Sequence, residues 1–372
     1  MNNYSKKIYF IASFGDFKKL PLGGGQTAAR RLLMTLRNIG YKVEVIKRHP
    51  PTANSKLCRA IQFGFWLCVD PVLFFFRIAF RSRKDAITLY MGYLGNVLVP
   101  LELSLSFIPR VLGFKNVMYL AGGGTEKLYK RSGSFVQRLE RITLNNFDLV
   151  MTEGIENMDF VKRISSASTF YLPNFVEEGF TPSIYPIKPN DRWNIMYFGR
   201  VDTVKNVLLG IDVFNYLCNK YENVSYTIVG GGPEGYCKQV EEKIASSPYK
   251  DKIVRKGRSS HEDLKVMMME QHFYLFPSNE PREGHSNSLN EAMGFGLVPV
   301  ASNNNFLPSI VGNSRLIANE MSVEAFASII ENVIISGDFE LLSQEMYERV
   351  RNNFTQGIVE KNIKGKIDNL FS

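Results

Sequence analysis

The sequence predicts an α/β protein made of two halves, in each of which strands and helices alternate. Short runs of β-branched and aromatic residues recur along the chain, and many of them end in glycine-containing turns that precede an amphipathic segment. A length of 372 residues with 45% hydrophobic and 22% charged residues suits two globular domains with sizeable cores. The chain is therefore expected to contain two parallel sheets, each covered by helices.

Six strands are expected in each half. Those of the first half lie near residues 7–13, 42–47, 86–91, 116–120, 148–152 and 169–172. Those of the second half lie near residues 194–198, 224–229, 252–255, 273–276, 298–301 and 315–317, and helices near 322–336, 339–352 and 355–371 follow. A proline-rich stretch with little periodicity marks a linker at 177–192, between a first domain over 1–176 and a second over 193–352.

A glycine turn opens the first half. A helix after Gly23–Gly25 should extend to about Ile39, because Gly40 is a typical C-terminal glycine signal. Backbone N–H groups near Gly24 and Gly25 could then approach a phosphate. A tight turn without a ligand is the alternative, since glycine turns are common.

The apolar stretch 63–80, FGFWLCVDPVLFFFRIAF, is nearly as long as a membrane span. Asp70–Pro71 breaks its middle and Arg77 adds a charge, which disfavours a spanning helix. We expect an interrupted helical segment, and burial in the core and contact with a membrane surface are both open for it.

Two cations follow the first strand of the second half. In NIMYFGRVDTVKNVLLGIDVF the strand ends at Gly199, and Arg200 and Lys205 precede an amphipathic helix. The carboxyl ends of strands are where open α/β sheets bind ligands. A planar guanidinium and a mobile ammonium suit a diphosphate, which they could stabilise as a leaving group. Solvated loop cations are the plainer interpretation.

Two carboxylates lie eight residues apart in PREGHSNSLNEAMGFGLVPV. Glu283 ends a strand and loop, whereas Glu291 lies in a helix expected to start near Ser286–Asn287 and to stop at Gly294–Gly296. Carboxylates bind sugar and ribose hydroxyls, and a helix N-terminus offers N–H groups to phosphate. Taken alone, the pair could equally be two surface glutamates.

A third motif, SYTIVGGGPEGYCKQVEEKI, runs from a strand into Gly230–Gly232, Pro233 and Glu234 before a helix. Glycines at such a turn permit tight backbone and close approach to a ligand. The signal is weak by itself, because many strand–helix units turn on glycine.

In this order the three motifs resemble the retaining GT-B glycosyltransferases of the family-4 type, also called glycosyl transferases group 1. The family shows Gly-Arg, a Lys five residues later, a G-G-G-P-E-like turn, and Glu-x7-Glu followed by A-M-x-x-G-x-P-V. The resemblance is strong over 193–312 and weaker over the first half, where Pro173–Asn174 looks like the family's P-N pair.

The resemblance implies two Rossmann-like, doubly wound domains facing a central cleft, with the terminal helix, within 353–372, packing back on the first domain. It implies transfer of a hexosyl group from a nucleoside-diphosphate sugar with retention, in which the leaving phosphate takes the acceptor's proton. Catalytic roles fall on Arg200, Lys205 and Glu283. Donor binding falls on Gly24, Gly25, Gly199, Gly231, His285, Ser286, Asn287, Ser288 and Glu291.

Two departures from the family pattern concern the transferred sugar. Many members have a histidine after the fourth strand, where this chain has YLAGGGTEKLYK, so Gly123, Thr125 and Glu126 become the acceptor-side candidates. His285 follows Gly284 where an aromatic residue or proline is frequent. It either touches the donor or only stabilises its own turn.

Charge is unevenly distributed. Residues 1–178 hold 25 basic and 13 acidic residues, so the whole net charge of +9 belongs to the first half. Basic surfaces attract anionic membranes or nucleic acid. The first half has no nucleic-acid-binding motif, so we expect a glycan or lipid-linked acceptor and an anionic membrane surface as partners.

The cysteines and histidines show no metal-ligand spacing, so no metal and no cofactor are expected. Scattered cysteines and no visible secretory signal favour a cytoplasmic protein, peripheral on the inner face of the membrane. Surface polysaccharide or glycoconjugate synthesis is the expected setting. Three alternatives stay open: a nucleotide-sugar 2-epimerase of the same fold, a non-catalytic nucleotide-sugar-binding subunit, and a nucleic-acid-binding protein suggested only by the pI of 9.2.

Overall fold

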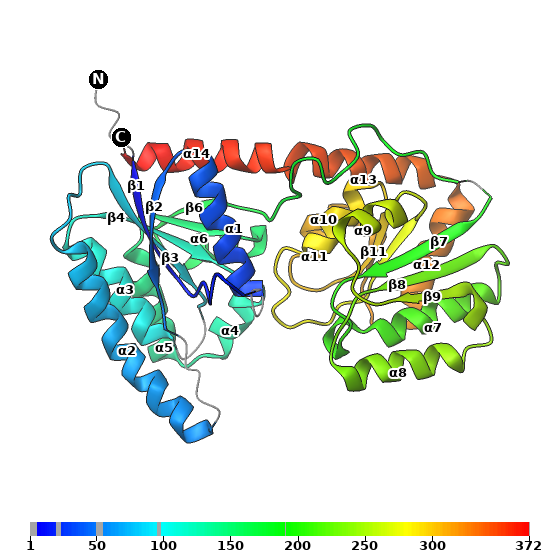
Figure 1. Cartoon of the computed structure of the whole chain (residues 1–372), viewed down its shortest axis with the longest axis horizontal. Helices are drawn as coiled ribbons and strands as arrows, with labels where there is room; N and C mark the ends of the chain where they lie inside the picture. The colour runs from blue at the N-terminus through cyan, green and yellow to red at the C-terminus, as the bar shows by residue number, and fades with distance from the viewer. Residues whose placement is uncertain (1–5, 20–23, 50–54, 95–97, 190, 372) are drawn as a thin grey trace. The chain divides into compact units, whose positions relative to one another are not determined.

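A computed structural model of the chain describes residues 6–19, 24–49, 55–94, 98–189 and 191–371. The chain forms two compact units (Figure 1). Unit 1 comprises Met1–Pro173 and Glu360–Ser372, and unit 2 comprises Asn174–Val359. Each unit is built around one six-stranded, entirely parallel sheet.

The sheet of unit 1 has the order β2-β1-β3-β4-β5-β6. Its strands are β1 (Lys7–Ala12), β2 (Lys42–Lys47), β3 (Ala86–Gly92), β4 (Lys115–Leu120), β5 (Leu149–Thr152) and β6 (Ser168–Tyr171). Its helices are α1 (Gly24–Asn38), α2 (Lys56–Ile78), α3 (Val99–Val111), α4 (Thr125–Arg131), α5 (Ser134–Asn145), α6 (Ile155–Ile164) and most of α14 (Gln356–Phe371).

The sheet of unit 1 is covered on both faces, as its sequence requires. Every residue of β3 (AITLYMG) is buried, which is the continuous apolar run typical of parallel sheets. Right-handed crossovers place α1 on one face and α2, α3 and α5 on the other, because the chain moves in opposite directions from β1 and from β2. One apolar cluster joins residues of α2, α3, α5 and α6 to the central strands.

The sheet of unit 2 has the order β12-β11-β10-β7-β8-β9. Its strands are β7 (Trp193–Phe198), β8 (Val224–Val229), β9 (Ile253–Lys256), β10 (Phe273–Phe276), β11 (Val298–Ser302) and β12 (Ile317–Ala318). Its α-helices are α7 (Val207–Cys218), α8 (Glu234–Ala245), α9 (His261–Met268), α10 (Asn287–Gly294), α11 (Leu307–Val311), α12 (Val323–Ser336) and α13 (Phe339–Asn353). Three 3₁₀ turns complete it: η1 (Thr203–Lys205), η2 (Lys250–Lys252) and η3 (Ser314–Leu316).

All twelve predicted strands are present, with ends displaced by no more than two residues. The interruption expected at Asp70–Pro71 is wrong, because α2 is one continuous helix from Lys56 to Ile78 with Pro71 inside it. Proline costs one backbone hydrogen bond there. Asp70 does not break the helix, because its carboxylate accepts hydrogen bonds from the backbone N–H of His49 at 3.1 Å and lies 2.7 Å from that residue's ring Nδ1.

The segment expected to link the halves packs on unit 2. Phe175, Val176 and Phe180 are buried, and Val176 forms a parallel bridge with Thr355. The helix α14 begins in unit 2 and continues into unit 1. There Asp368 accepts hydrogen bonds from Lys6 and from the hydroxyl of Tyr41, both at 2.8 Å.

Candidate active site

The strand order of unit 2 reverses between β7 and β10. From β7 the chain proceeds outward through β8 and β9, and it then returns to β10 on the other side of β7. Loops leaving the carboxyl ends of two such neighbouring strands diverge, and open α/β sheets bind ligands in the crevice that this creates. The loop after β7 carries Arg200 and Lys205, and the loop after β10 carries Glu283 and leads into α10.

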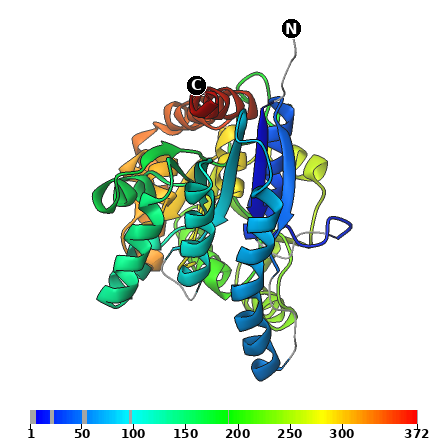
Figure 2. The ribbon, with the colours of Figure 1, turned by 90° about the vertical axis from the view of Figure 1, so that its left-hand side faces the viewer.

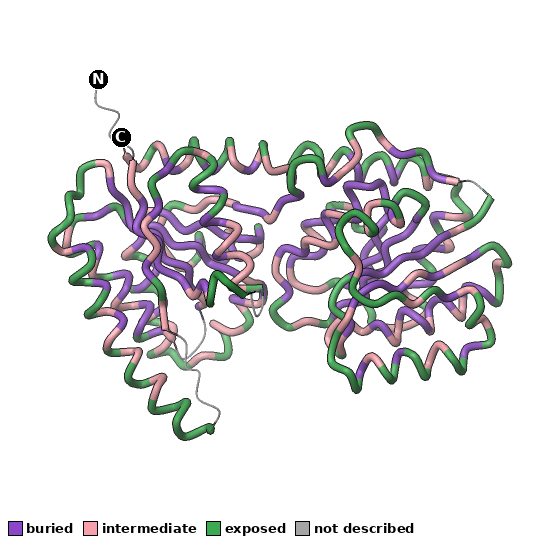
Figure 3. The backbone as a smooth tube through the Cα atoms, in the orientation of Figure 1, coloured by how far each residue is buried: buried purple, intermediate pink, exposed green. Residues whose placement is uncertain are grey.

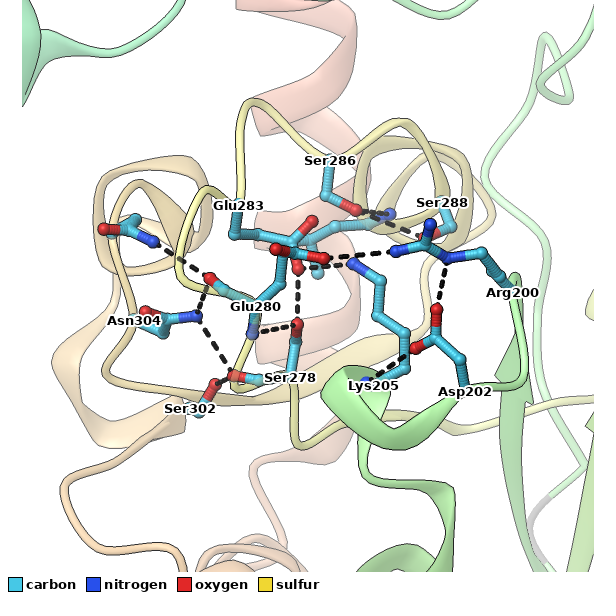
Figure 4. Close-up of polar contacts among 12 residues, drawn as sticks. Arg200, Asp202, Lys205, Ser278, Glu280, Glu283, Ser286, Ser288, Ser302 and Asn304 are labelled. Carbon is cyan, nitrogen blue, oxygen red and sulfur yellow. Dashed lines mark hydrogen bonds and ion pairs between the residues drawn. The ribbon is translucent and has the colours of Figure 1, made fainter. Parts of the chain in front are cut away.

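Lys205 and Glu283 form the centre of this site (Figure 4). The ammonium nitrogen of Lys205 lies 2.5 Å from Oε2 of Glu283, and the hydroxyl of Ser278 donates to the same oxygen. Only 12% of the lysine side chain and 9% of the glutamate side chain are exposed. A charge pair so little exposed costs desolvation energy, so it is more typical of a functional site than of a stabilising contact.

Local turns hold both members of this pair in place. The carboxylate of Asp202 accepts the backbone N–H of Lys205 at 3.1 Å and so caps η1. The backbone N–H of Glu283 donates to the carbonyl of Glu280 at 3.1 Å, closing a turn whose second residue is Pro281. A backbone hydrogen bond of 2.7 Å from Asn279 to Val204 ties the two loops together.

Arg200 is held by two acidic side chains. Its Nε lies 2.5 Å from Asp202, and its terminal nitrogen Nη2 donates to Glu280 at 3.1 Å. The side chain is 58% exposed, so the guanidinium lies at the open edge of the site and can reach a bound anion (Figure 4). Asp202 and Glu280 therefore orient Arg200, and the sequence motif had not indicated either of them.

The loop after β10 is also fastened from behind. The carbonyl of Ser278 accepts hydrogen bonds from the Ser302 hydroxyl at 2.6 Å and from the Asn304 amide at 3.2 Å (Figure 4). The same amide donates to the carbonyl of Glu280 at 2.9 Å. These bonds fix the loop that carries Glu283. Their donors lie after β11, far from the predicted motif in sequence.

The N-terminus of α10 faces the same loops. Ser286 caps the helix, accepting the backbone N–H of Leu289 at 3.4 Å, and its hydroxyl lies 3.2 Å from that of Ser288. The hydroxyl of Tyr274 lies 2.8 Å from both the Ser288 hydroxyl and the Phe198 carbonyl. Burial raises the pKa of Tyr274 well above its ordinary value, so this hydroxyl stays protonated. Polar groups and the positive end of the helix dipole thus lie together, as anion binding requires.

The glycines after β7 and β8 pack against each other. A Cβ at Gly230 would lie 1.8 Å from the carbonyl oxygen of Gly199, and one at Gly232 would lie 1.6 Å from that of Val201. Gly199 and Gly230 also have φ angles of 142° and 139°, which L side chains rarely adopt. At Gly231, the donor-binding candidate between them, a Cβ would meet the side chain of Arg258 at 3.2 Å. This tight packing is one reason for the glycines that the sequence could not reveal.

The remaining candidates of unit 2 lie on or beside α10. Asn287 begins the helix, and Glu291, half-buried, lies one turn further along. The ring of His285 is buried and packs edge-on against Phe354, with ring centroids 5.0 Å apart. The backbone carbonyl of His285 accepts a hydrogen bond of 2.7 Å from the Asn174 amide. His285 therefore helps to hold the segment at the start of unit 2 beside α10.

The candidates of unit 1 lie at the carboxyl ends of its strands. Gly24 and Gly25 begin α1, and a Cβ at Gly25 would lie 2.1 Å from the Tyr93 hydroxyl. Gly23 lies outside the described residues. Thr125 and Glu126 begin α4, after Gly123. Ion pairs with Lys130 at 2.8 Å and Arg163 at 2.6 Å lower the pKa of Glu126 and turn its carboxylate toward α6.

Sequence reasoning missed Glu153, which shapes the loop after β4. Its carboxylate accepts hydrogen bonds from the Tyr119 hydroxyl at 2.8 Å and from the backbone N–H of Gly122 at 3.0 Å. Gly122 and Gly124 have left-handed φ angles of 80° and 72°. Glu153 follows β5, so only the tertiary fold brings it to the acceptor-side glycines.

The residues of unit 2 have the chemistry of a site for a phosphorylated, hydroxyl-rich ligand. Two cations and a helix N-terminus can bind phosphate, and carboxylates can accept hydrogen bonds from hydroxyl groups. Within the described ranges, no three His, Cys, Asp or Glu side chains gather as the ligands of one metal ion would.

Comparison with known proteins identifies the class. Residues 186–356 match the model of the family described as Glycosyl transferases group 1, and this part of the chain belongs to that family. The solved structure of a sucrose-phosphate synthase from Thermosynechococcus elongatus superposes with a TM-score of 0.72 at 17% identity, covering 98% of this chain and 99% of the other. The chain thus has the GT-B glycosyltransferase fold predicted from its sequence.

Two further similarities concern sugar-nucleotide chemistry. An Escherichia coli structure described as trehalose-6-phosphate bound with UDP-2-fluoro glucose superposes with a TM-score of 0.67 at 12% identity over 98% of this chain and 99% of that one. The phosphatidylinositol N-acetylglucosaminyltransferase GPI3 subunit of Saccharomyces cerevisiae strain YJM789 is 25% identical over 211 residues, which are 54% of this chain. The match spans 44% of the length of that relative and 33% of the length of a human relative of the same description.

Proposed function

We propose that this protein is a retaining glycosyltransferase that transfers a hexosyl group from a nucleoside-diphosphate sugar to a glycan or lipid-linked acceptor. One observation carries the proposal: Arg200, Lys205 and Glu283 converge beside the N-terminus of α10, where the sheet order of unit 2 reverses. The matched family and the sugar-nucleotide bound in a structural neighbour support it.

In the proposed reaction, the bond between the anomeric carbon and the diphosphate oxygen breaks, and a bond to the acceptor oxygen forms on the same face. The acceptor's proton passes to the departing phosphate. Arg200 and Lys205 stabilise the charge that develops on the diphosphate, while the N–H groups near Ser286–Ser288 and near Gly24 bind its oxygens. Protein cations thus do the work of a metal ion in this proposal, and neither a metal nor a cofactor is required.

Glu283 binds hydroxyls of the transferred sugar, and Lys205 fixes the direction of its carboxylate. Glu291, on α10, accepts hydrogen bonds from the ribose. The acceptor contacts the loop of Gly123, Thr125 and Glu126 in unit 1. A lipid-linked acceptor would place the protein in the cytoplasm at the inner face of the membrane, in the synthesis of surface polysaccharide or another glycoconjugate.

A thermal-shift panel tests the donor site first. UDP, GDP, ADP, CMP and their common sugar conjugates are added to the wild type, to Glu291→Ala and to Glu241→Ala, an exposed glutamate of α8 that serves as the control. One nucleoside diphosphate should raise the melting temperature of the wild type and of the control, and less so that of Glu291→Ala. No shift with any nucleotide at millimolar concentration would overturn the proposal.

Product analysis then distinguishes the alternatives. Conversion of the donor into an epimer without any acceptor would identify a nucleotide-sugar 2-epimerase. Binding without turnover, with every acceptor fraction tested, would identify a non-catalytic binding protein, although Arg200, Lys205, Glu283 and Glu291 are all present in the chain. Turnover that is lost in EDTA and restored by Mg²⁺ would contradict the metal-independent mechanism.

A further inference from the structure

Three neighbouring helices of unit 1 expose apolar side chains to solvent. The helix α2 packs beside α3, and α3 packs beside α5, on one face of the sheet (Figures 1 and 2). We call their outward surface the α2–α3–α5 face. On α3 it includes Phe107 and Val111, which are 55% and 64% exposed, and on α5 Phe135, which is 73% exposed.

The largest part of this face is a stripe along α2. Leu57, Ile61, Phe65, Val72 and Phe76 are spaced by four or seven residues, so they lie on one side of the helix. Their exposed fractions are 72, 64, 56, 54 and 62%, and most of the α2 backbone is coloured as exposed in Figure 3. A helix of 23 residues is about 35 Å long, so this stripe is far larger than scattered surface apolar residues.

Every exposed charge on the three helices and on the turn after α2 is positive. The acidic residues there are Asp70, Glu102 and Glu140, and their exposed fractions are 6, 0 and 0%. The exposed basic residues of these segments are Lys56, Arg59, Arg77, Arg81, Arg83, Lys84, Arg110, Arg138 and Arg141. The face thus combines apolar side chains with cations, and burial withdraws its acidic groups.

By length and composition α2 is the one helix in the described part of the chain that could cross a membrane, and only 22% of its most apolar window is buried. Its inner side belongs to the fold, however. Phe74 and Ile78 are 1% and 0% exposed within the core cluster, and Asp70 binds His49, whose ring stacks on Trp66 at 4.1 Å. A helix fixed along a sheet in this way can lie in a membrane surface with its outer side inserted.

We propose that the α2–α3–α5 face docks on an anionic lipid bilayer, with the apolar stripe of α2 among the acyl chains and the surrounding cations at the headgroups. Charge complementarity favours this occupant. A second copy of the face would set cation against cation, and a nucleic acid would cover the apolar stripe with phosphates. The inference deepens the proposed function, because a membrane-bound protein meets a lipid-linked acceptor, but docking itself needs no turnover.

Vesicle co-sedimentation of the full-length protein tests the proposal. The vesicles contain either phosphatidylcholine alone or phosphatidylcholine with 30 mol% phosphatidylglycerol, a composition chosen for its negative charge. We compare the wild type with Ile61→Ser/Phe65→Ser/Phe76→Ser and with Arg77→Gln/Arg81→Gln/Arg83→Gln. The matched control is Val254→Ser/Val266→Ser/Ile335→Ser, whose three residues are exposed apolar side chains of unit 2.

The wild type and the control should bind the anionic vesicles, and binding should weaken as salt is added. Each basic residue near an anionic surface contributes about fivefold, so the arginine variant should bind about 100-fold more weakly. The apolar variant should lose binding as well. Circular dichroism and the nucleotide thermal shift verify that the variants are folded.

Three results would overturn the proposal: failure of the wild type to bind anionic vesicles, equal binding by the apolar variant, or concentration-dependent dimerisation that the apolar variant abolishes. The last would identify the face as an interface between copies. Lys205→Ala should dock normally, so failure of the glycosyltransferase proposal and failure of the docking proposal are distinguishable.

Discussion

The ammonium group of Lys205 lies 2.5 Å from the carboxylate of Glu283, and both side chains are almost fully withdrawn from solvent. The two residues come from the loops after β7 and β10, so 78 residues of sequence separate them. Such a pair couples function to stability, because removal of one member leaves the other charge buried without its partner.

Turnover should fall by about 100-fold or more in Lys205→Ala and in Glu283→Ala, because each removes a group that stabilises the transition state. Steady-state assays with saturating donor measure this. Lys243→Ala is the matched control, since it breaks a 2.7 Å ion pair with Asp212 on the surface of unit 2 and should leave turnover unchanged. Near-normal turnover of folded Lys205→Ala would remove Lys205 from the mechanism.

The same pair predicts a non-additive effect on stability. Lys205→Met and Glu283→Gln should each lower the free energy of unfolding of unit 2, by up to about 3 kcal/mol, because each leaves one buried group uncompensated. The double variant should be less destabilised than the sum of the two. Urea unfolding of all four proteins measures this, and additive losses would mean that the two groups do not interact in solution.

Glu291→Ala should raise the KM for the donor more than it lowers kcat, because a ribose contact is made equally in the ground state and in the transition state. Initial rates over a range of donor concentrations separate the two constants. An unchanged donor KM would count against the ribose role.

Gly232→Ala should destabilise the paired loops after β7 and β8, because the new methyl group would lie 1.6 Å from the Val201 carbonyl oxygen. We expect a lower melting temperature together with weaker nucleotide binding. Gly235→Ala is the control: that position has open space and lies in α8, where alanine is favoured over glycine by roughly 0.5–1 kcal/mol. Equal melting temperatures of the two variants would show that the loops separate easily.

The stability of unit 2 should fall as the pH is lowered from 6.5 to 4. Burial lowers the pKa of His272 to about 4. Its Nδ1 accepts the backbone N–H of Asn194 at 3.1 Å and its Nε2 donates to the Pro189 carbonyl at 2.7 Å, so the folded protein needs the neutral ring. Between these pH values only the unfolded chain takes up the proton, at a cost to stability on the order of 3 kcal/mol.

His272→Gln tests this directly, because a glutamine can accept and donate without titrating. Chemical unfolding at several pH values should give a flatter pH dependence in the variant than in the wild type. Trp193, whose ring lies 5.3 Å from that of His272, reports on unit 2 by fluorescence if Trp66 of unit 1 is replaced by phenylalanine in both proteins. Identical slopes would show that His272 does not control the acid sensitivity.

Local patterns sufficed for the strands and for Arg200, Lys205 and Glu283, because strand runs and strand-end motifs are written in contiguous residues. The partners that hold these side chains could not be found in this way. Ser302 and Asn304 support the loop of Glu283 from the far side of β11, and only the parallel pairing of β10 with β11 brings them there. Continuity of α2 through Pro71 was missed for the same reason, since it depends on the contact of Asp70 with His49.

The course of α14 has a consequence for biosynthesis. Unit 2 is continuous in sequence, whereas unit 1 is completed by residues 360–372. While the chain emerges from the ribosome, Lys6 and Tyr41 wait for Asp368 until all of unit 2 has been translated. The half that is made first is therefore the half that is finished last, and a chain cut short near residue 359 would hold a complete unit 2 beside an unfinished unit 1.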